Sequence, residues 1–271
     1  MSERIAFIGG GNMAGAIIGG LIQQGTPAHE IDVVEPHADA QAQLKTLYGI
    51  TAQAQPGAVL TQASVVVWAI KPQTFREAAL QVRFHTKNAL HLSVAAGIRS
   101  DSIARWVASE RVVRAMPNTP ALIGKGITAL YARPSVQAEE KLRIEKVLAP
   151  TGQLLWLDAE VQLDAVTALS GSGPAYVFYF MEAMIDAGSA MGLTRDQAYQ
   201  LAMATFIGAG ELAHSSNEPP EILRARVTSK GGTTHAALSS LEDDEVKTRF
   251  IRAMHAARRR AKEMGDEFGG T

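Results

Sequence analysis

A glycine cluster near the first residue of the sequence has the composition of a phosphate-binding loop. Residues 9–14 read Gly-Gly-Gly-Asn-Met-Ala and fit the pattern G-x-G-x-x-G/A. In such a loop the first glycine permits a tight turn, the second lets backbone N–H groups approach a pyrophosphate, and the last small residue lets a helix pack against a strand. An unliganded glycine-rich turn is the alternative. The pattern predicts that a dinucleotide contacts Gly9, Gly10, Gly11, Asn12, Met13 and Ala14.

A carboxylate follows where dinucleotide-binding proteins contact the adenosine ribose. Glu35 lies close to the roughly 20-residue offset at which an acidic side chain accepts a hydrogen bond from the 2′-hydroxyl of NAD. An arginine there would favour NADP, so Glu35 favours NADH. A solvated strand end is an equally weighted interpretation of Glu35. His37 could contact a 2′-phosphate when protonated, although a lone loop histidine usually has no such role.

The glycine cluster needs a strand before it and a helix after it, and the sequence predicts both. Residues 4–8 are a short apolar strand candidate. The isoleucines and leucine of residues 17–22 recur at helical spacing. Further strand candidates are residues 31–34, 65–70, 90–94, 112–115, 127–131 and 154–157, and helical stretches are residues 39–48, 102–107 and 136–148. This alternation, with apolar strands such as 65–70, is typical of an α/β Rossmann-type doubly wound parallel sheet.

The pattern changes after about Asp158, and the remaining residues predict an all-α C-terminal domain. Thr194 with Gln197 forms a capping box, residues 219–220 suit a helix start, and Gly192 and Gly265 suit helix ends. We therefore expect a dinucleotide-binding domain over residues 1–160 and an all-helical substrate and dimerisation domain over residues 161–271.

The predicted helix over residues 175–191 is apolar nearly all round and carries few charges. A helix of this kind requires burial on every side. A helical domain of about 110 residues would struggle to enclose it, so a subunit interface is expected, with a central core helix as the alternative.

Composition narrows the class of partner. The 26 basic and 27 acidic residues give a formal net charge of -1, which argues against nucleic acid and anionic membranes and favours a small-molecule substrate. The absence of cysteine excludes disulfides and thiolate chemistry, and the seven histidines lack metal-ligand spacing, so no metal is expected. With neither an export signal nor an apolar run long enough for a membrane span, we expect a cytoplasmic protein.

Several segments, taken together and in this order, resemble one family. They are FIGGGNMA (residues 7–14), AIKPQ (69–73), SVAAGI (93–98), RAMPNTP (114–120), GSGPAYVF (171–178) and VTSKGGTT (227–234). The chain resembles pyrroline-5-carboxylate reductase along its whole length. One departure is Lys230, where the family usually has proline, so the rigidity and charge of that loop differ from the family pattern.

The resemblance implies reduction of Δ1-pyrroline-5-carboxylate to proline with NADPH or NADH, and a helical domain that interlocks with a second subunit in a homodimer or a ring of dimers. It implies that Asn118 faces the nicotinamide and that Ala69, Lys71 and Pro72 line the cofactor cleft, although for Lys71 a surface role is nearly as expected.

The resemblance also implies a substrate loop at Ser229, Gly231, Gly232, Thr233 and Thr234, with Thr234 as the catalytic residue that meets the imine nitrogen. Paired glycines that open a helix are physically suited to bind a carboxylate. A helix-capping turn is the alternative role for this loop, and N-capping is the alternative role for Thr234.

Two other functions fit parts of the pattern. A β-hydroxyacid dehydrogenase has the same domain order but relies on a lysine early in the helical half, and this chain has no lysine between Lys146 and Lys230. A dinucleotide-binding sensor would bind the cofactor without turnover, and oxidation of the reduced cofactor on addition of the imine would exclude it.

Overall fold

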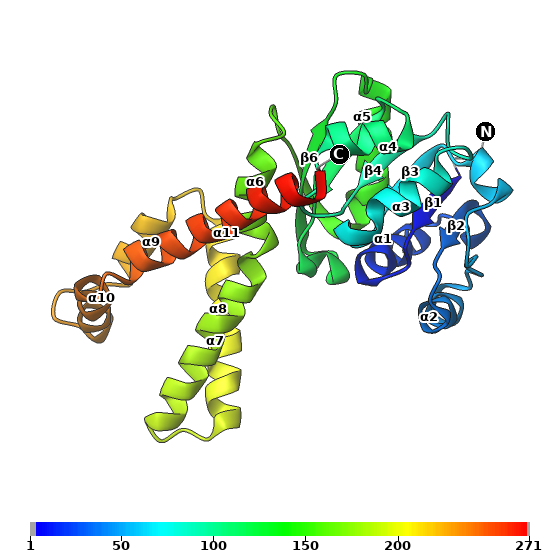
Figure 1. Ribbon diagram of the computed structural model, residues 1–271. Coiled ribbons are helices and arrows are strands. Elements are labelled where there is room, and N and C mark those ends of the chain that lie inside the picture. The colour runs from blue at the N-terminus through cyan, green and yellow to red at the C-terminus, as the bar shows by residue number, and fades with distance from the viewer. Residues whose placement is uncertain (1–3, 270–271) are drawn as a thin grey trace. The chain divides into compact units, whose positions relative to one another are not determined.

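A computed structural model describes residues 4–269, and these form two compact units. The first contains residues 4–172 together with 257–269, and the second contains residues 173–256. Figure 1 shows the elements of both units.

The first unit is built on one seven-stranded sheet in the order β2-β1-β3-β4-β5-β6-β7. Its strands are β1 (Ile5–Ile8), β2 (Ile31–Val34), β3 (Val65–Trp68), β4 (Leu90–Ser93), β5 (Val112–Met116), β6 (Gly126–Ala132) and β7 (Gly152–Trp156). Strands β1 to β5 are parallel, and β6 runs antiparallel to β5 and parallel to β7. The expected doubly wound sheet is confirmed as a mostly parallel one.

The apolar composition of a strand indicates whether it lies in the centre of this sheet. All four residues of β3, Val-Val-Val-Trp, are buried, and the strand pairs with β1 on one side and β4 on the other. Residues buried on both faces are typical of a central strand in a parallel sheet covered by helices.

Helices cover both faces of the sheet (Figure 1). One core contains buried residues of α1 (Asn12–Gln23), α2 (Ala38–Tyr48) and α5 (Ala138–Leu148). The opposite core contains buried residues of α3 (Pro72–Val82) and α4 (Ser100–Val107). Short 3-10 helices lie at η1 (Ala28–Glu30), η2 (Ala58–Gln62), η3 (Thr119–Ile123) and η4 (Ala149–Thr151), and α6 (Gln162–Val166) leads into a π-helix at Thr167–Gly171.

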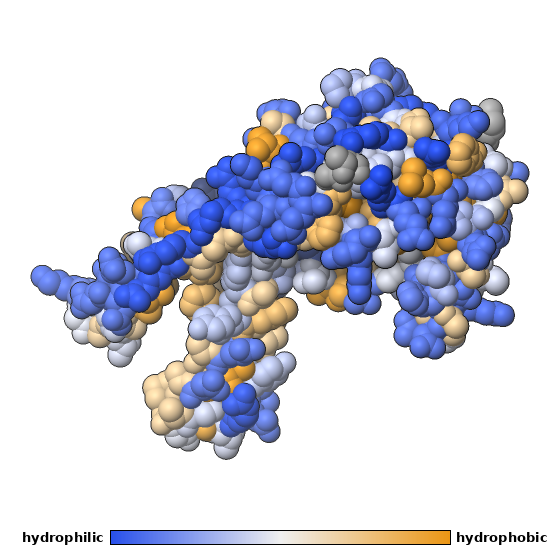
Figure 2. Space-filling view, in the orientation of Figure 1, coloured by the Kyte–Doolittle hydropathy of each residue, from blue (hydrophilic) through white to orange (hydrophobic). Residues whose placement is uncertain are grey.

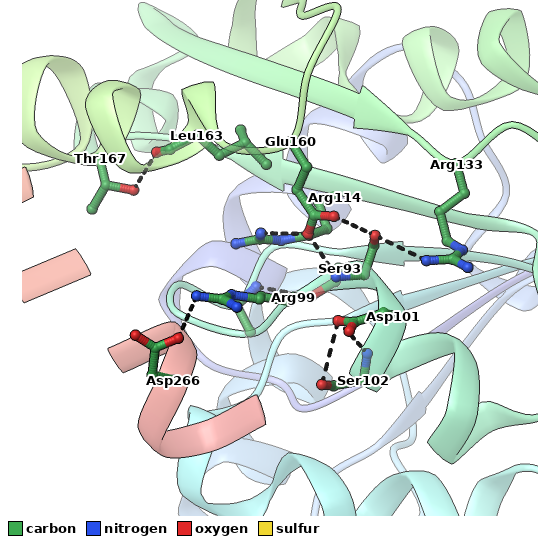
Figure 3. Close-up of polar contacts among 12 residues, drawn as sticks. Ser93, Arg99, Asp101, Ser102, Arg114, Arg133, Glu160, Leu163, Thr167 and Asp266 are labelled. Atoms are coloured by element: carbon green, nitrogen blue, oxygen red, sulfur yellow. Dashed lines mark hydrogen bonds and ion pairs between the residues drawn. The ribbon is translucent and has the colours of Figure 1, made fainter. Parts of the chain in front are cut away.

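The end of α11 (Val246–Gly269) completes the first unit and forms a C-terminal clasp, defined here as residues 257–269. Phe268 packs against the core of α3 and α4, and the Ser102 hydroxyl donates to the Gly269 carbonyl at 3.0 Å. Arg99 and Asp266 form an ion pair between exposed side chains (Figure 3).

The predicted helix end at Gly265 is wrong, because α11 continues through it to Gly269. A Cβ atom at Gly265 would lie 3.2 Å from the Nε atom of Arg99, so this glycine allows close packing inside the helix.

The second unit is helical. It contains α7 (Gly173–Ala190), α8 (Arg195–Ser215), α9 (Pro220–Arg226), α10 (Thr233–Asp243) and the first part of α11. The capping box of Thr194 and Gln197 is present at the start of α8, and Pro220 opens α9 as predicted. Helices α7 and α8 lie side by side (Figure 1).

Helix α7 is not a core helix of this chain. Of its residues only Ile185 and Gly188 are buried, whereas Val177, Phe178, Tyr179 and Met184 are exposed. Figure 2 shows apolar residues on the surface of the α7–α8 pair. Among the residues from 4 to 269, none of the helices is both long and apolar enough to cross a bilayer.

Candidate functional site

The order of the strands creates a crevice at one edge of the sheet. From β1 the chain passes to β2 on one side, and then to β3 on the other side of β1. In open α/β sheets ligands bind at the carboxyl ends of the strands where the order reverses. Gly9 follows β1, Glu35 follows β2 and Ala69 follows β3, so the structure brings these three predicted residues to one edge.

Gly9 occupies a position that only glycine fits. Its φ is +94°, its N–H donates to the Val34 carbonyl at 2.8 Å, and a Cβ atom would lie 2.5 Å from the carbonyl oxygen of Ala69. Both the backbone conformation and the close approach exclude a side chain. The loop that joins β1 to α1 is therefore held tightly against the loop after β3.

Gly11 leaves the start of α1 open, whereas Gly10 packs closely against Leu44. Gly11 is the N-cap residue of α1, no side chain caps this helix, and a Cβ atom at Gly11 would meet no atom within 4 Å. Asn12 and Met13 form the first turn, and Ala14 is fully buried against the core. A helix start with free N–H groups and open space above it suits an anion, so the residues present fit a pyrophosphate.

Glu35, which follows β2, is hydrogen-bonded to the loop between β1 and α1. The residue is only 6% exposed, and its two carboxylate oxygens accept from the N–H groups of Gly10 and His37, each at 2.8 Å. The interpretation of Glu35 as a solvated strand end is therefore wrong. Each carboxylate oxygen can accept more than one hydrogen bond, so both keep acceptor capacity for a ribose hydroxyl.

Two cavities adjoin the loop. One of about 430 Å³ is lined by Ile8, Gly9, Val34, Pro36, Ala54, Gln55, Pro56, Ile70, Thr74, Glu77, Ala78, Gln81 and Val82. The other, of about 540 Å³, runs from Gly10, Gly11 and Asn12 along α1 toward Gly124 and Pro150. Sequence reasoning missed Gln55, Thr74 and Glu77. Their signal is positional, since Thr74 and Glu77 lie in the first two turns of the helix that follows β3.

The other predicted cofactor residues differ in how firmly they are held. Lys71 is the exposed N-cap residue of α3, and Pro72 is the first residue of that helix. The side-chain oxygen of Asn118 accepts from the Ile127 N–H at 3.0 Å, which ties the loop after β5 to the start of β6. Its amide nitrogen has no partner among the residues that the structure describes.

A partly buried ion pair between β5 and the segment before α6 was missed by sequence reasoning (Figure 3). Arg114 in β5 is 8% exposed and donates to Glu160 at 2.7 Å. The carboxylate of Glu160 also accepts from the N–H of Ser100, at 2.6 Å, and from its hydroxyl. Glu160 therefore caps α4 from a distant segment and compensates the buried charge of Arg114.

Two of the family-like segments also meet within the first unit. A Cβ atom at Gly171 would lie 2.5 Å from the Cε atom of Met116. Gly171 ends the π-helix, in which the Ser172 N–H donates to the Thr167 carbonyl at 2.8 Å. Short π-helices occur frequently at functional sites.

The predicted substrate loop belongs to the second unit. Gly231 has φ +73°, Gly232 is the N-cap residue of α10, and its N–H donates to the Ser229 carbonyl at 3.0 Å. No side chain caps α10, so the N–H groups of its first turn are free of such a partner. Thr233 and Thr234 are its first two residues, and Lys230 is exposed beside them. N-capping by Thr234 is therefore contradicted.

Two family models match the chain, one in its N-terminal part and one in its C-terminal part. Residues 4–97 match the model described as NADP oxidoreductase coenzyme F420-dependent, and residues 160–264 match the model described as pyrroline-5-carboxylate reductase dimerisation.

Comparison with whole proteins extends the similarity to nearly every residue. A pyrroline-5-carboxylate reductase of Pseudomonas aeruginosa is 42% identical over 270 residues, which is 99% of each chain. The structure of such a reductase from Coxiella burnetii has a TM-score of 0.90 at 36% identity, over 97% of this chain and 99% of that one. A Plasmodium falciparum pyrroline carboxylate reductase structure with NADP bound has a TM-score of 0.87 at 27% identity, over 97% and 98%. The chain belongs to the pyrroline-5-carboxylate reductase family.

Proposed function

We propose that the chain reduces Δ1-pyrroline-5-carboxylate to L-proline with NADH or NADPH, the last step of proline biosynthesis. The observation that carries this proposal is the 42% identity to a named reductase across 99% of both chains. The uncapped starts of α1 and α10 also support it, because each suits an anionic group, a pyrophosphate at α1 and a carboxylate at α10.

The cofactor is assigned to the edge of the first unit. Its pyrophosphate would lie on the N–H groups at Gly10, Gly11, Asn12 and Met13, with Gly9 and Ala14 shaping the turn. The ribose would meet Glu35, and Ala69, Pro72 and Asn118 would line the way to the nicotinamide. When bound, the reduced nicotinamide supplies a hydride.

The substrate carboxylate is assigned to the loop of the second unit. Ser229, Gly231, Gly232 and Thr233 surround the uncapped start of α10, where backbone N–H groups and the positive end of the helix dipole favour an anion. The exposed Lys230 adds a positive charge to the same loop. This loop therefore supplies the binding energy that holds the ring in place.

The chemical step converts the ring C=N bond to a C–N bond. Hydride adds to the imine carbon, and a proton, from solvent or already on the substrate, remains on nitrogen. A hydroxyl is too weak an acid to supply the charge alone, so Thr234 is assigned hydrogen bonding to the nitrogen and orientation of the ring. A protonated imine is already electrophilic, which fits a helical half that has no lysine before Lys230.

The working form is proposed to be a homodimer or a ring of dimers in the cytoplasm. The match of residues 160–264 to a dimerisation model and the exposed apolar residues of α7 support association of two copies. We assign dinucleotide binding to residues 1–160 and substrate binding with dimerisation to residues 161–271.

Turnover by the purified protein tests the proposal. Pyrroline-5-carboxylate should cause oxidation of NADH or NADPH at 340 nm and form stoichiometric proline without added metal. A chain that binds either cofactor but produces no proline would be a sensor and would contradict the proposal.

A further inference from the structure

The carboxylate of Glu35 is held at one place by the backbone. It is buried, and hydrogen bonds from Gly10 and His37 fix both of its oxygens between the loop after β1 and the start of α2. A carboxylate held in this way cannot swing aside to admit another anion. The chain therefore keeps a fixed negative charge at the point where the ribose 2′ position is expected.

The residues that line the two cavities beside Glu35 provide no compensating cation. Val34 and Pro36, its two neighbours in sequence, line the 430 Å³ cavity, and Gly10, its hydrogen-bond donor, lines the 540 Å³ cavity. Neither set of lining residues, within the described part of the chain, includes an arginine or a lysine. The charged residue that does line the first cavity is Glu77, a second carboxylate.

A 2′-phosphate differs from a 2′-hydroxyl in charge and in hydrogen-bonding capacity, and this environment opposes both changes. It brings about two negative charges and only acceptor oxygens, whereas the hydroxyl can donate to a carboxylate. Sites that accept the phosphate provide an arginine near this point. Here the corresponding segment is Glu35-Pro36-His37, in which the exposed His37 engages its backbone N–H and carbonyl in hydrogen bonds but not its imidazole.

We propose that this site selects NADH over NADPH, with the fixed carboxylate of Glu35 as the main determinant and Glu77 as a second one. The inference rests on the proposed function for its cofactor class, and it adds the choice between the two cofactors.

Binding and turnover test the inference separately. Titration calorimetry with NAD⁺ and NADP⁺ should give at least tenfold tighter binding of NAD⁺, and kcat/KM at saturating imine should favour NADH by a similar factor. Equal or tighter binding of NADP⁺ would overturn the inference. Absence of turnover with both cofactors would contradict the proposed function, while the binding data would still decide the inference.

Three variants locate the determinant. Glu35→Gln removes the charge and keeps an acceptor for the Gly10 N–H, and it should narrow the NAD⁺ preference about tenfold by strengthening NADP⁺. Glu77→Gln should reduce the ratio of NAD⁺ to NADP⁺ affinity by a smaller factor. His37→Arg adds a cation at an exposed site and should also strengthen NADP⁺, which keeps the test available if Glu35→Gln fails to fold.

Glu139→Gln provides the matched control, because Glu139 is an exposed carboxylate on α5 far from these residues in sequence. Its ratio of NAD⁺ to NADP⁺ affinity should equal that of the unmodified chain. An unchanged ratio in both Glu35→Gln and His37→Arg would overturn the assignment.

Discussion

The hydroxyl of Thr234 at the start of α10 does not cap the helix. Thr234 is the second residue of α10, inside the helix, and the N-cap position that a threonine often occupies is held here by Gly232, which has no side chain to cap with. Its hydroxyl is therefore not engaged in stabilising the helix. This leaves it available for a ligand at the open helix start.

Thr234→Ala should lower kcat/KM for the imine about tenfold to a thousandfold, which corresponds to roughly 1.4–4 kcal/mol of transition-state stabilisation. Cofactor affinity and Tm should change little, because no capping hydrogen bond is lost. Steady-state kinetics and thermal unfolding measure the two effects. Ser240→Ala, an exposed change on the same helix, is the control. Kinetics equal to those of the unmodified chain would remove Thr234 from the site.

At the scale of single residues, sequence reasoning was strongest where the backbone itself is constrained. Gly9 and Ala14 could be predicted because a positive φ and tight helix packing leave few residue types. The ion pair of Arg114 with Glu160 could not, because nothing local to either residue indicates a partner so far away in sequence.

At the scale of elements, the β3–β4 pair buries a histidine that the proposed chemistry does not use. His91 in β4 is fully buried, and its Nδ1 accepts from the Trp68 indole N–H at 3.1 Å. Burial, with a smaller contribution from the Arg111 guanidinium, lowers the pKa of His91 to about 3, and the backbone at Thr86 opposes this shift only in part. The folded chain therefore keeps this imidazole neutral.

Stability should fall in acid because of His91. The unfolded chain binds a proton at its ordinary pKa near 6.5 and the folded chain only near 3, so the contribution is complete above about pH 6.5 and is lost as the pH falls toward 3. Between pH 7.5 and 5 the unmodified chain should lose about 2 kcal/mol more than His91→Gln. Urea unfolding at one fixed protein concentration measures this difference. His255→Gln, an exposed change, should behave like the unmodified chain, and parallel losses in all three proteins would contradict the prediction.

Sequence periodicity predicted the positions of the strands along the chain well. It did not predict how the strands pair with one another. Residues 31–34 form β2 as predicted, and residues 65–68 of the predicted 65–70 form β3. The antiparallel pairing of β6 with β5 was not predicted, because apolar content does not reveal strand direction. Gly265 was misassigned since a glycine in a helix can reflect packing as well as an end.

At the scale of the whole molecule, the exposed apolar face of α7 predicts association. Phe178 is 56% exposed and Tyr179 is 68% exposed, on a helix with mostly apolar residues. Burial of such side chains contributes roughly 1.5–3 kcal/mol each, so two copies of this face can stabilise each other strongly.

Light scattering should therefore give the mass of a dimer or a multiple of dimers at micromolar concentration. Phe178→Asp places a charge on this face and should shift the mass toward that of one chain. Leu47→Asp, on α2 and similarly exposed, should leave the mass unchanged. A monomeric mass for the unmodified chain would contradict the prediction.

The C-terminal clasp has a consequence for the order of events during synthesis. The core of α3 and α4 contains Phe268, which the ribosome adds only after the second unit has been made. At roughly 5–20 residues per second, the intervening unit takes about 4 to 17 s to translate. During that interval residues 4–172 emerge without Phe268 on the core of α3 and α4 and without the hydrogen bond from Ser102 to Gly269. The nascent chain is thus an expected client for chaperones until α11 has left the exit tunnel.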